Sequence, residues 1–595
     1  MRTPPSSTLV SPPRRWLRRL IAVGAAVAAV ASATACDLAG AASAPETPKT
    51  GGTLYIITQA DFDVLDPQRS YAAVEANFLR LTTRALTTYK SEAGAGASEV
   101  VGDLATDAGR PSDNNTVWRF NLKNGVRWED GSPVTCSQVR YGIQRRFSKD
   151  VIMAGGAPYP LTYLQDNSPD PYLGPWVAGD NNGKGLESIK CLDEKRIEFH
   201  LSQPVGDFGY AVAMSVFAPV PPEKDTKEAY ARYPFSNGPY KIEPGSHTDK
   251  QLVLVRNPFW DPKTDQVRKA YPERIVFQFR EDAFGAVTNE MIEDQGDAKN
   301  TIMLDVNVAP NFLQQVVNDP ELLDRAVTGT TGAVRYFAIN TKRMTNPACR
   351  EALIHSFNKR KFRAVFGGSA LGDYATTMIP PQLKAHKKFD VFDSVTHPEG
   401  DPDRAFQIIE EQAKTKSPCP TKVTVAFPDS ALRRRLMNTV VEAYQRVGIE
   451  IELKAINPRD YYQDFAGDPA NAYDMIWAGW VPDWAQGSAI IPPLFDGDVI
   501  PPLDPITGHG AGNVNFSNLN EKSINDQIDA ALAETTPERQ FALWGDLDMQ
   551  IQQKAVTIPI LYEKAIRMAG SNIRGGYIHS AFGMPDLCSL GLAQP

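Results

Sequence analysis

The segment "YDMIWAGWVPDWAQG" at 473–487 places an acid, Asp483, between two indoles, Trp480 and Trp484, directly after an apolar run of strand length. Core strands do not usually end with a carboxylate between two aromatic rings. Such a carboxylate can bind a cation through a charged hydrogen bond, which is stronger than a neutral one. Because Asp483 follows Pro482, it can equally cap a turn or a helix start, and the sequence leaves both interpretations open.

The common catalytic and metal-binding motifs are absent from the sequence. Neither H-E-x-x-H nor G-x-x-x-x-G-K-[ST] occurs, and "GGSALG" at 367–372 has Leu371 where a G-x-S-x-G turn needs glycine. No C-x-x-C pair exists and the seven histidines are scattered, so no zinc, redox or cofactor site is predicted. With 70 acids, carboxylate pairs arise by chance, so an exported hydrolase is the less favoured hypothesis.

The first 35 residues have the plan of an export signal. Their basic residues, which include Arg2 and Arg19, precede the apolar stretch "LIAVGAAVAAVA" at 20–31, which is too short to span a bilayer. "ATAC" at 33–36 is similar to a bacterial lipobox, with Ala33 where leucine is usual, and predicts a lipid on Cys36. Residues 36–48 would then tether the folded body to the outer face of the cell membrane. General and twin-arginine export both remain open.

Length and charge narrow the class of protein. A chain of 595 residues exceeds one hydrophobic core, so two or three lobes are expected. The signal carries five arginines and no acids, so the rest of the chain has a formal net charge of −13, against −8 for the whole. An acidic body without a basic, aromatic-rich block argues against nucleic-acid binding.

The elements that must position Asp483 are those of a mixed α/β protein. Strands are predicted at 53–58, 333–340, 422–427, 449–456 and 557–563, and helices at 346–362, 401–416 and 429–448. The strand–helix–strand order from 422 to 456 predicts parallel pairing. Alternation at 116–122, followed by turn residues up to 135, predicts a hairpin, and 150–185 reads as a long ordered loop.

Six segments, in this order, resemble the peptide/nickel family (family 5) of extracellular solute-binding proteins of ABC importers. They are "LDP" at 65–67, "WRFNLKNGVRWEDGSPVT" from 118, "NGPYKI" at 237–242, "LVRNPFW" at 254–260, "CREALIHSFNKRKF" at 349–362 and "AGWVPDW" at 478–484. The resemblance implies an α/β, two-lobed periplasmic-binding-protein-like fold (type II, cluster C) with an additional domain inserted in the first lobe. We expect a base lobe at 49–88, 215–330 and 557–595, an inserted domain at 89–214 and a second lobe at 331–556.

The resemblance also implies a ligand and its site. The protein would bind an oligopeptide between the lobes, as a monomer, and deliver it to ABC permease subunits in the membrane. Asp483 would meet the α-ammonium of the peptide, while the backbone of Ala478, Gly479 and Trp480 would pair with the main chain of the ligand. The segment Ser70, Tyr71, Ala72 and Ala73 would flank the ligand from the other lobe, and Trp484 would complete the site.

Two further expectations depend on this resemblance. The lobe boundaries pair Cys136 with Cys191 and Cys349 with Cys419 as disulfides, leaving Cys588; buried reduced thiols are the alternative. Relatives in the family also bind nickel chelates, haem or oligosaccharides. Because aromatic platforms suit sugars, the closely spaced Trp477, Trp480 and Trp484 keep an oligosaccharide or a metal chelate open as the cargo, although core packing also explains these indoles.

Overall fold

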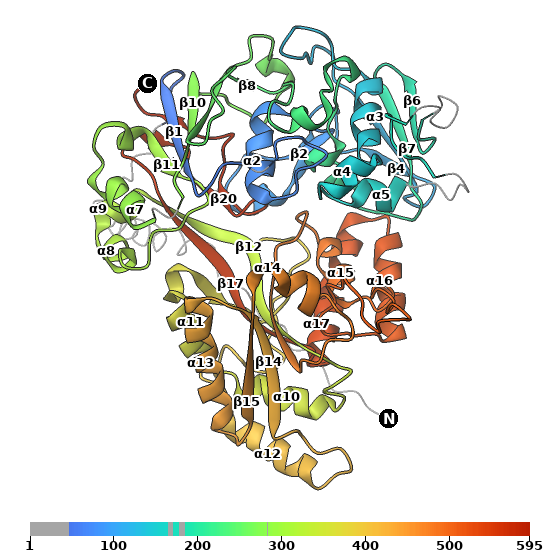
Figure 1. The fold of residues 1–595 in the computed structure, drawn as a ribbon, viewed down its shortest axis with the longest axis vertical. Coiled ribbons are helices and arrows are strands. Elements are labelled where there is room, and N and C mark those ends of the chain that lie inside the picture. The colour runs from blue at the N-terminus through green and yellow to red at the C-terminus, as the bar shows by residue number, and fades with distance from the viewer. Residues whose placement is uncertain (1–46, 63, 165–170, 178–184, 282–283) are drawn as a thin grey trace, which may run out of the picture. The chain divides into compact units, whose positions relative to one another are not determined.

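The computed structural model describes residues 47–595 except 63, 165–170, 178–184 and 282–283. The predicted signal at 1–35, Cys36 with its predicted lipid and most of the predicted tether therefore lie outside the described residues. Residues 48–595 form one unit by their internal contacts, and Figure 1 shows its elements from the blue strand β1 to the red strand β17.

A five-stranded sheet begins at the predicted strand 53–58. Its order is β11 (Thr301–Met303), β1 (Thr53–Thr58), β10 (Arg274–Phe279), β9 (Gln251–Arg256) and β8 (Tyr240–Ile242). Strand β1 runs parallel to both β10 and β11, and its Ile56 and Ile57, which lie on opposite faces, are fully buried. Burial on both faces is typical of parallel strands, which explains the continuous apolar run in this segment. The helices nearest in sequence are α2 (Ala73–Thr82), α7 (Phe284–Glu293), α8 (Leu313–Asn318) and α9 (Pro320–Asp324).

A separate four-stranded sheet lies within residues 110–200, with the order β4 (Arg110–Ser112), β5 (Val117–Asn121), β7 (Arg196–His200) and β6 (Ile189–Asp193). All of its pairs are antiparallel. Its neighbours in sequence are α3 (Cys136–Arg145), α4 (Lys149–Met153), α5 (Tyr159–Leu164) and α6 (Phe208–Ala211). Short two-stranded pairs complete this half, β2 (Thr87–Tyr89) with β3 (Val100–Gly102), β18 (Ile573–Arg574) with β21 (Gly591–Leu592), and β19 (Ile578–His579) with β20 (Met584–Pro585).

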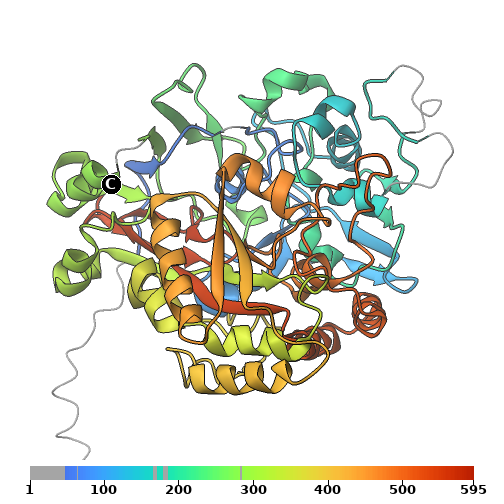
Figure 2. The same ribbon diagram turned by 60° about the horizontal axis from the view of Figure 1, so that its bottom comes forward.

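A six-stranded sheet organises the other lobe, in the order β13 (Gly372–Tyr374), β17 (Thr557–Met568), β12 (Ala326–Ile339), β16 (Met475–Trp480), β14 (Lys422–Pro428) and β15 (Glu450–Ile456). The predicted parallel pairing of 422–427 with 449–456 is confirmed by β14 and β15. The helices of this lobe are α10 (Pro347–Ser356), α11 (Lys359–Phe366), α12 (Pro402–Ala413), α13 (Ala431–Gln445), α14 (Pro458–Asp460), α15 (Ile491–Phe495), α16 (Lys522–Ala533) and α17 (Pro537–Gln553). Helix α13 packs against β15 and α11, and Figure 2 shows it beside the orange strands.

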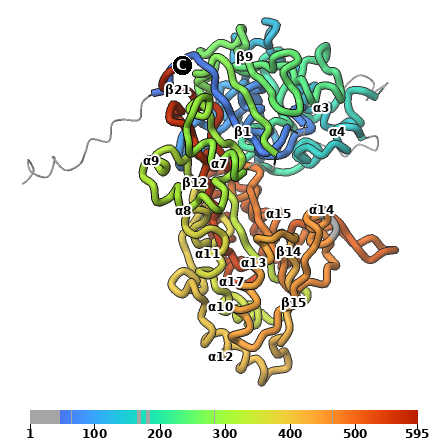
Figure 3. Tube along the Cα trace, turned by 60° about the vertical axis from the view of Figure 1, so that its left-hand side comes forward, coloured from blue at the N-terminus to red at the C-terminus, as the bar shows by residue number. Residues whose placement is uncertain are grey.

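Strands β12 and β17 connect the two lobes. They pair from Ala326 opposite Met568 to Ala338 opposite Thr557, with register shifts near Thr330 and Arg335. An isolated antiparallel β-bridge joins Ile302, in the edge strand β11 of the five-stranded sheet, to Ala569, just beyond β17. Figure 3 shows β12 passing between the upper and lower groups of elements. The mixed α/β chain therefore has two lobes joined by a pair of adjacent long strands.

Three predictions of local structure need correction. Strand β5 does not pair with the residues directly after it, because β4 and β7 occupy both of its edges. The predicted hairpin is limited to the Asp130-Gly131 turn, where Arg127 bridges Pro133 and the Trp128 N–H donates to the Ser132 carbonyl at 2.8 Å. The helix expected over 346–362 is two helices, since Phe357 is extended and the side chain of Asn358 caps α11. The long loop at 150–185 includes the short helices α4 and α5, and α5 proves important for the site.

Both predicted disulfides are present. Cys136 bonds to Cys191 and Cys349 bonds to Cys419, while Cys588 is a buried free thiol. The first bond ties the start of α3 to β6, and the second ties α10 to the segment before β14. Within the described ranges, no helix has both the length and the apolar character needed to cross a membrane.

Candidate functional site

Asp483 lies three residues beyond the end of β16, and two tyrosines hold its carboxylate. The Tyr71 hydroxyl is 2.9 Å from each carboxylate oxygen, and the Tyr159 hydroxyl donates to Oδ2. Tyr71 precedes α2, whereas Tyr159 begins α5. Among the described residues, Asp483 accepts no backbone N–H bond, so it does not cap a turn or a helix. This removes the competing interpretation of its role.

The electrostatic surroundings of Asp483 favour a cationic ligand group. Burial raises its pKa above the ordinary range, and the hydrogen bonds from Tyr159 and Tyr71 oppose that shift. Burial and the nearby carboxylate raise the pKa of both tyrosines, so they remain protonated donors. No lysine, arginine or histidine in the described part of the chain forms an ion pair with Asp483. A half-buried carboxylate without a counter-ion, such as Asp483, can be stabilised by a ligand that supplies one.

The register of β16 distinguishes the three residues predicted to offer backbone bonds. Strand β12 lies along one edge, with Arg335 opposite Gly479. The Trp477 carbonyl accepts from the Tyr461 hydroxyl at 2.7 Å, so Trp477 has its backbone polar groups on the other edge. Backbone direction alternates along a strand, so Gly479 shares that edge while Ala478 and Trp480 face β12. Strand β14 pairs with β16 only at Met475 and Ile476, so it does not cover this edge at Gly479. Of the three residues predicted to pair with the ligand main chain, Gly479 is therefore the one whose N–H and C=O lie on the uncovered edge.

A cationic cluster lies beside Gly479. A Cβ at this glycine would be 2.3 Å from Arg335 Nη1, so the guanidinium lies directly over the backbone. Arg335 pairs with Glu563 and stacks on the Trp477 ring at 5.1 Å. Arg433 makes no side-chain hydrogen bond or ion pair within the described chain, and burial followed by repulsion from Arg335 lowers its pKa. Two guanidinium groups with one carboxylate leave an excess positive charge, which suits an anionic ligand group.

The three indoles have different roles. Trp477 and Trp484 are 2% and 3% exposed, so neither is available as an open platform for a sugar ring. The Trp484 Nε1 donates to Asp207 Oδ2 at 2.7 Å, and its ring lies 4.7 Å from that of Tyr159. Trp480 is half-buried and lines a cavity. Core packing therefore explains two of the three aromatic residues.

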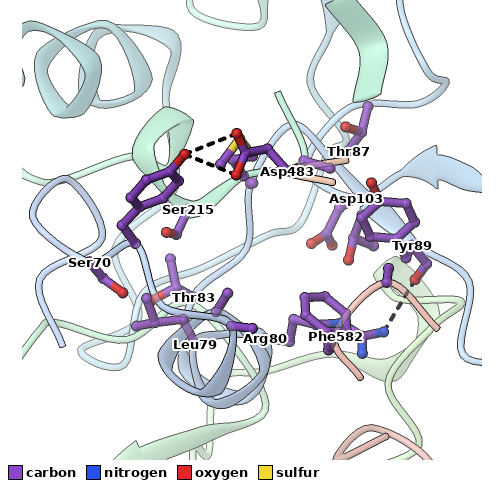
Figure 4. Close-up of a pocket in the computed structure, with 18 of the residues that line it drawn as sticks. Ser70, Leu79, Arg80, Thr83, Thr87, Tyr89, Asp103, Ser215, Asp483 and Phe582 are labelled. Atoms are coloured by element: carbon purple, nitrogen blue, oxygen red, sulfur yellow. Dashed lines mark hydrogen bonds between the residues drawn. The ribbon is translucent and has the colours of Figure 1, made fainter. Parts of the chain in front are cut away.

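A cavity of about 420 Å³ lies between Asp483 and helix α2 (Figure 4). It includes most of the sequence-predicted residues, namely Ser70, Tyr71, Ala73, Trp480 and Asp483, but not Ala72, Ala478, Gly479 or Trp484. Apolar groups such as Leu79 and Phe582 form much of its wall. A volume of this size is within the range of small-molecule binding sites.

Several residues of the site were not predicted from the sequence. Tyr159 lies in the segment interpreted as a loop, where the spacing of Tyr159 and Tyr163 by four residues is the one sign of a helix face. Tyr89 lines the cavity, and its hydroxyl accepts the Ala485 N–H at 3.0 Å. Arg80 also lines the cavity, yet in the sequence it is an ordinary helix arginine.

Comparisons with known proteins agree with this architecture. The chain is 20% identical over 538 residues to the glutathione-binding protein GsiB of Salmonella paratyphi A, covering 89% of this chain and 91% of that protein. It is 28% identical over 256 residues to the periplasmic oligopeptide-binding protein OppA of Salmonella typhimurium, covering 41% and 43%.

A solved structure gives a closer match. The clavulanic acid biosynthesis oligopeptide binding protein 2 has a TM-score of 0.83 and 28% identity, covering 92% of this chain and 97% of that one. The model of the family described as bacterial extracellular solute-binding proteins, family 5 middle, matches residues 99–500. The chain therefore belongs to family 5 of the bacterial extracellular solute-binding proteins.

Proposed function

We propose that this protein is an extracytoplasmic, membrane-anchored receptor of an ABC importer that captures oligopeptides between its two lobes and delivers them to a permease. The observation that carries the proposal is the Asp483 carboxylate, which faces a 420 Å³ cavity without a cationic partner among the described residues. A peptide α-ammonium supplies the missing positive charge. Binding, and not catalysis, is the role that this arrangement supports.

The peptide backbone and its far end also find complementary groups. Gly479 offers its N–H and C=O on the edge of β16 that β14 leaves uncovered, which suits addition of a ligand strand. Arg433 and Arg335 lie on the same lobe, and their excess positive charge suits a ligand carboxylate. A free-amine oligopeptide has these three features, and the names of the relatives support the same ligand class.

Delivery requires a body that closes and an anchor that keeps it near the permease. We assign 49–88, 215–330 and 557–595 to the base lobe, 89–214 to the inserted domain and 331–556 to the second lobe. Closure would bend the paired strands β12 and β17. A lipid on Cys36 would hold the protein on the extracytoplasmic face of the membrane, as a monomer.

The test is to identify what the protein retains from its producing cell. Mass spectrometry of ligand released from native protein should detect peptides. A thermal-shift screen should then show that tri- to pentapeptides raise the melting temperature, whereas cello- and malto-oligosaccharides do not. Stabilisation by oligosaccharides or by a metal chelate, with no response to peptides, would replace the proposed ligand class.

A further inference from the structure

Three polar groups on the wall of the cavity lack hydrogen-bond partners among the described residues. They are Ser70 Oγ, Arg80 Nε and Thr83 Oγ1. The three residues are only 4%, 6% and 8% exposed. A buried donor or acceptor that makes no hydrogen bond lowers the stability of the folded state, because it has lost its bonds to water. Buried polar groups in folded proteins are generally satisfied, and an exception at a binding cavity indicates a ligand that completes the bonding.

Helix α2 brings these groups to one side of the cavity. Arg80 lies in the last turn of α2, Thr83 is the extended residue that follows the helix directly, and Ser70 lies shortly before the helix. All three residues line the cavity. Figure 4 shows Arg80 and Thr83 at the helix, with Asp483 across the cavity. Arg80 is fixed in place, because Nη1 donates to Asp586 at 2.6 Å and Nη2 to the Tyr89 carbonyl at 3.3 Å. Its Nε is therefore a donor in a defined position.

The charges around the cavity select against an ionic side chain. The Arg80 charge is balanced by Asp586, and Arg268 is paired with Asp103 at 2.7 Å. An acidic side chain would find no uncompensated cation there and would be repelled by Asp483. A basic side chain would lie beside two guanidinium groups. A neutral group that both accepts and donates hydrogen bonds fits this wall best.

We propose that this cavity binds the neutral amide side chain of the first residue of the ligand, which makes the protein selective for peptides that begin with asparagine or a similar residue. This rests on the proposed function, because Asp483 fixes the α-ammonium at the same cavity. The amide oxygen accepts from Arg80 Nε and from the Thr83 hydroxyl. The amide nitrogen donates to Ser70 Oγ, since a hydroxyl can accept as well as donate.

The test compares three peptides that differ only in a nearly isosteric first side chain: Asn-Ala-Ala, Leu-Ala-Ala and Asp-Ala-Ala. Calorimetry on the wild type should rank the asparagine peptide first. Thr83→Val keeps the shape of the side chain and removes its hydroxyl. It should weaken binding of Asn-Ala-Ala by roughly threefold to tenfold, the effect of one hydrogen bond, and leave Leu-Ala-Ala unchanged.

Thr82→Val is the matched control. The Thr82 hydroxyl is also buried and without a partner among the described residues, at 1% exposure, but Thr82 does not line the cavity. This variant should bind all three peptides like the wild type. Ser70→Ala provides a second test of the wall, and thermal denaturation establishes that each variant is folded.

The outcomes separate the two proposals. If the wild type binds the three peptides equally, or if Thr83→Val weakens all three by the same factor, the amide pocket is wrong while peptide binding stands. If the wild type binds no free-amine peptide, the proposed function fails and the pocket assignment fails with it.

Discussion

The Tyr159 hydroxyl donates to the carboxylate of Asp483, although the two residues are 324 positions apart in the chain. Tyr71 reaches the same carboxylate from 412 positions away. The acid is therefore hydrogen-bonded by side chains that precede it by more than half of the sequence. These bonds orient the carboxylate and stabilise its ionised form without supplying a positive charge.

Asp483→Asn should weaken binding of free-amine peptides by orders of magnitude. The substitution keeps the size of the side chain but removes the charge that pairs with the ammonium, and loss of one partner from a buried pair costs about 3–5 kcal/mol. Isothermal calorimetry measures the effect directly. N-acetylated peptides serve as the control and should bind both proteins with similar, weak affinity; equal binding of acetylated and free peptides by the wild type would rule out the ammonium contact.

The affinity for free-amine peptides should fall as the pH is lowered through the pKa of Asp483, because the protonated acid carries no charge. Burial raises this pKa and the tyrosine hydrogen bonds lower it, so Tyr159→Phe should raise it further. The variant should therefore lose affinity at a higher pH than the wild type, while its ring can still contact Trp484. Titrations across the acidic range test this, and identical pH profiles would contradict it.

The same raised pKa affects the ligand-free fold. A carboxyl whose pKa is higher in the folded than in the unfolded chain makes folding less favourable as the pH rises through that interval. Asp483→Asn should remove this contribution. The variant should therefore gain stability relative to the wild type near neutral pH, with the difference shrinking in acid, as urea denaturation at several pH values would show.

Removal of either disulfide should lower the free energy of unfolding by about 4 kcal/mol in the chain-entropy model. The bridges span separations of 55 and 70 residues, so the expected effects are similar. Urea denaturation of a Cys136→Ser, Cys191→Ser double variant, and of the equivalent pair for Cys349 and Cys419, measures them. Peptide mapping without reduction should find both links, and a linked peptide that contains Cys588 would overturn this pairing.

Cys36→Ser should move the protein from the membrane fraction to the soluble fraction. Two acyl chains give stable anchoring, whereas one gives only marginal binding, so loss of the lipidated residue should release the whole body. Detergent partitioning of cell extracts, with the wild type as reference, makes the comparison. Unchanged partitioning of the variant would refute the lipid anchor.

Local signals in the sequence were sufficient for much of the fold. The strand at 53–58 and the start of the helix at 401 appear as predicted, because each depends on neighbouring residues; the Asp401 side chain caps α12 and Pro402 begins it. The hairpin predicted over 116–135 forms only as a short bridge between Arg127 and Pro133, because β5 itself pairs with β4 and with β7, which is distant in the sequence. The break at Asn358 had a local sign, since asparagine is a favourable helix cap.

The candidate site shows the same contrast between features with a local sequence signal and features that depend on distant residues. Asp483 was identifiable from its own surroundings in the sequence. Its tyrosine partners were not, because a hydrogen bond across hundreds of residues leaves no periodicity or spacing to detect. The unpaired hydroxyls of Ser70 and Thr83 were equally invisible, since only the folded chain reveals which polar groups remain without partners.

The buried Cys588 gives the protein an internal reporter of its own unfolding. It is 2% exposed, and burial raises its pKa to about 12, so almost none of it is thiolate at neutral pH in the folded state. It is also the only cysteine outside a disulfide in the described part of the chain. An alkylating reagent can therefore react with Cys588 only after local or global unfolding exposes the thiol. The labelling rate under non-reducing conditions measures how often this unfolding occurs.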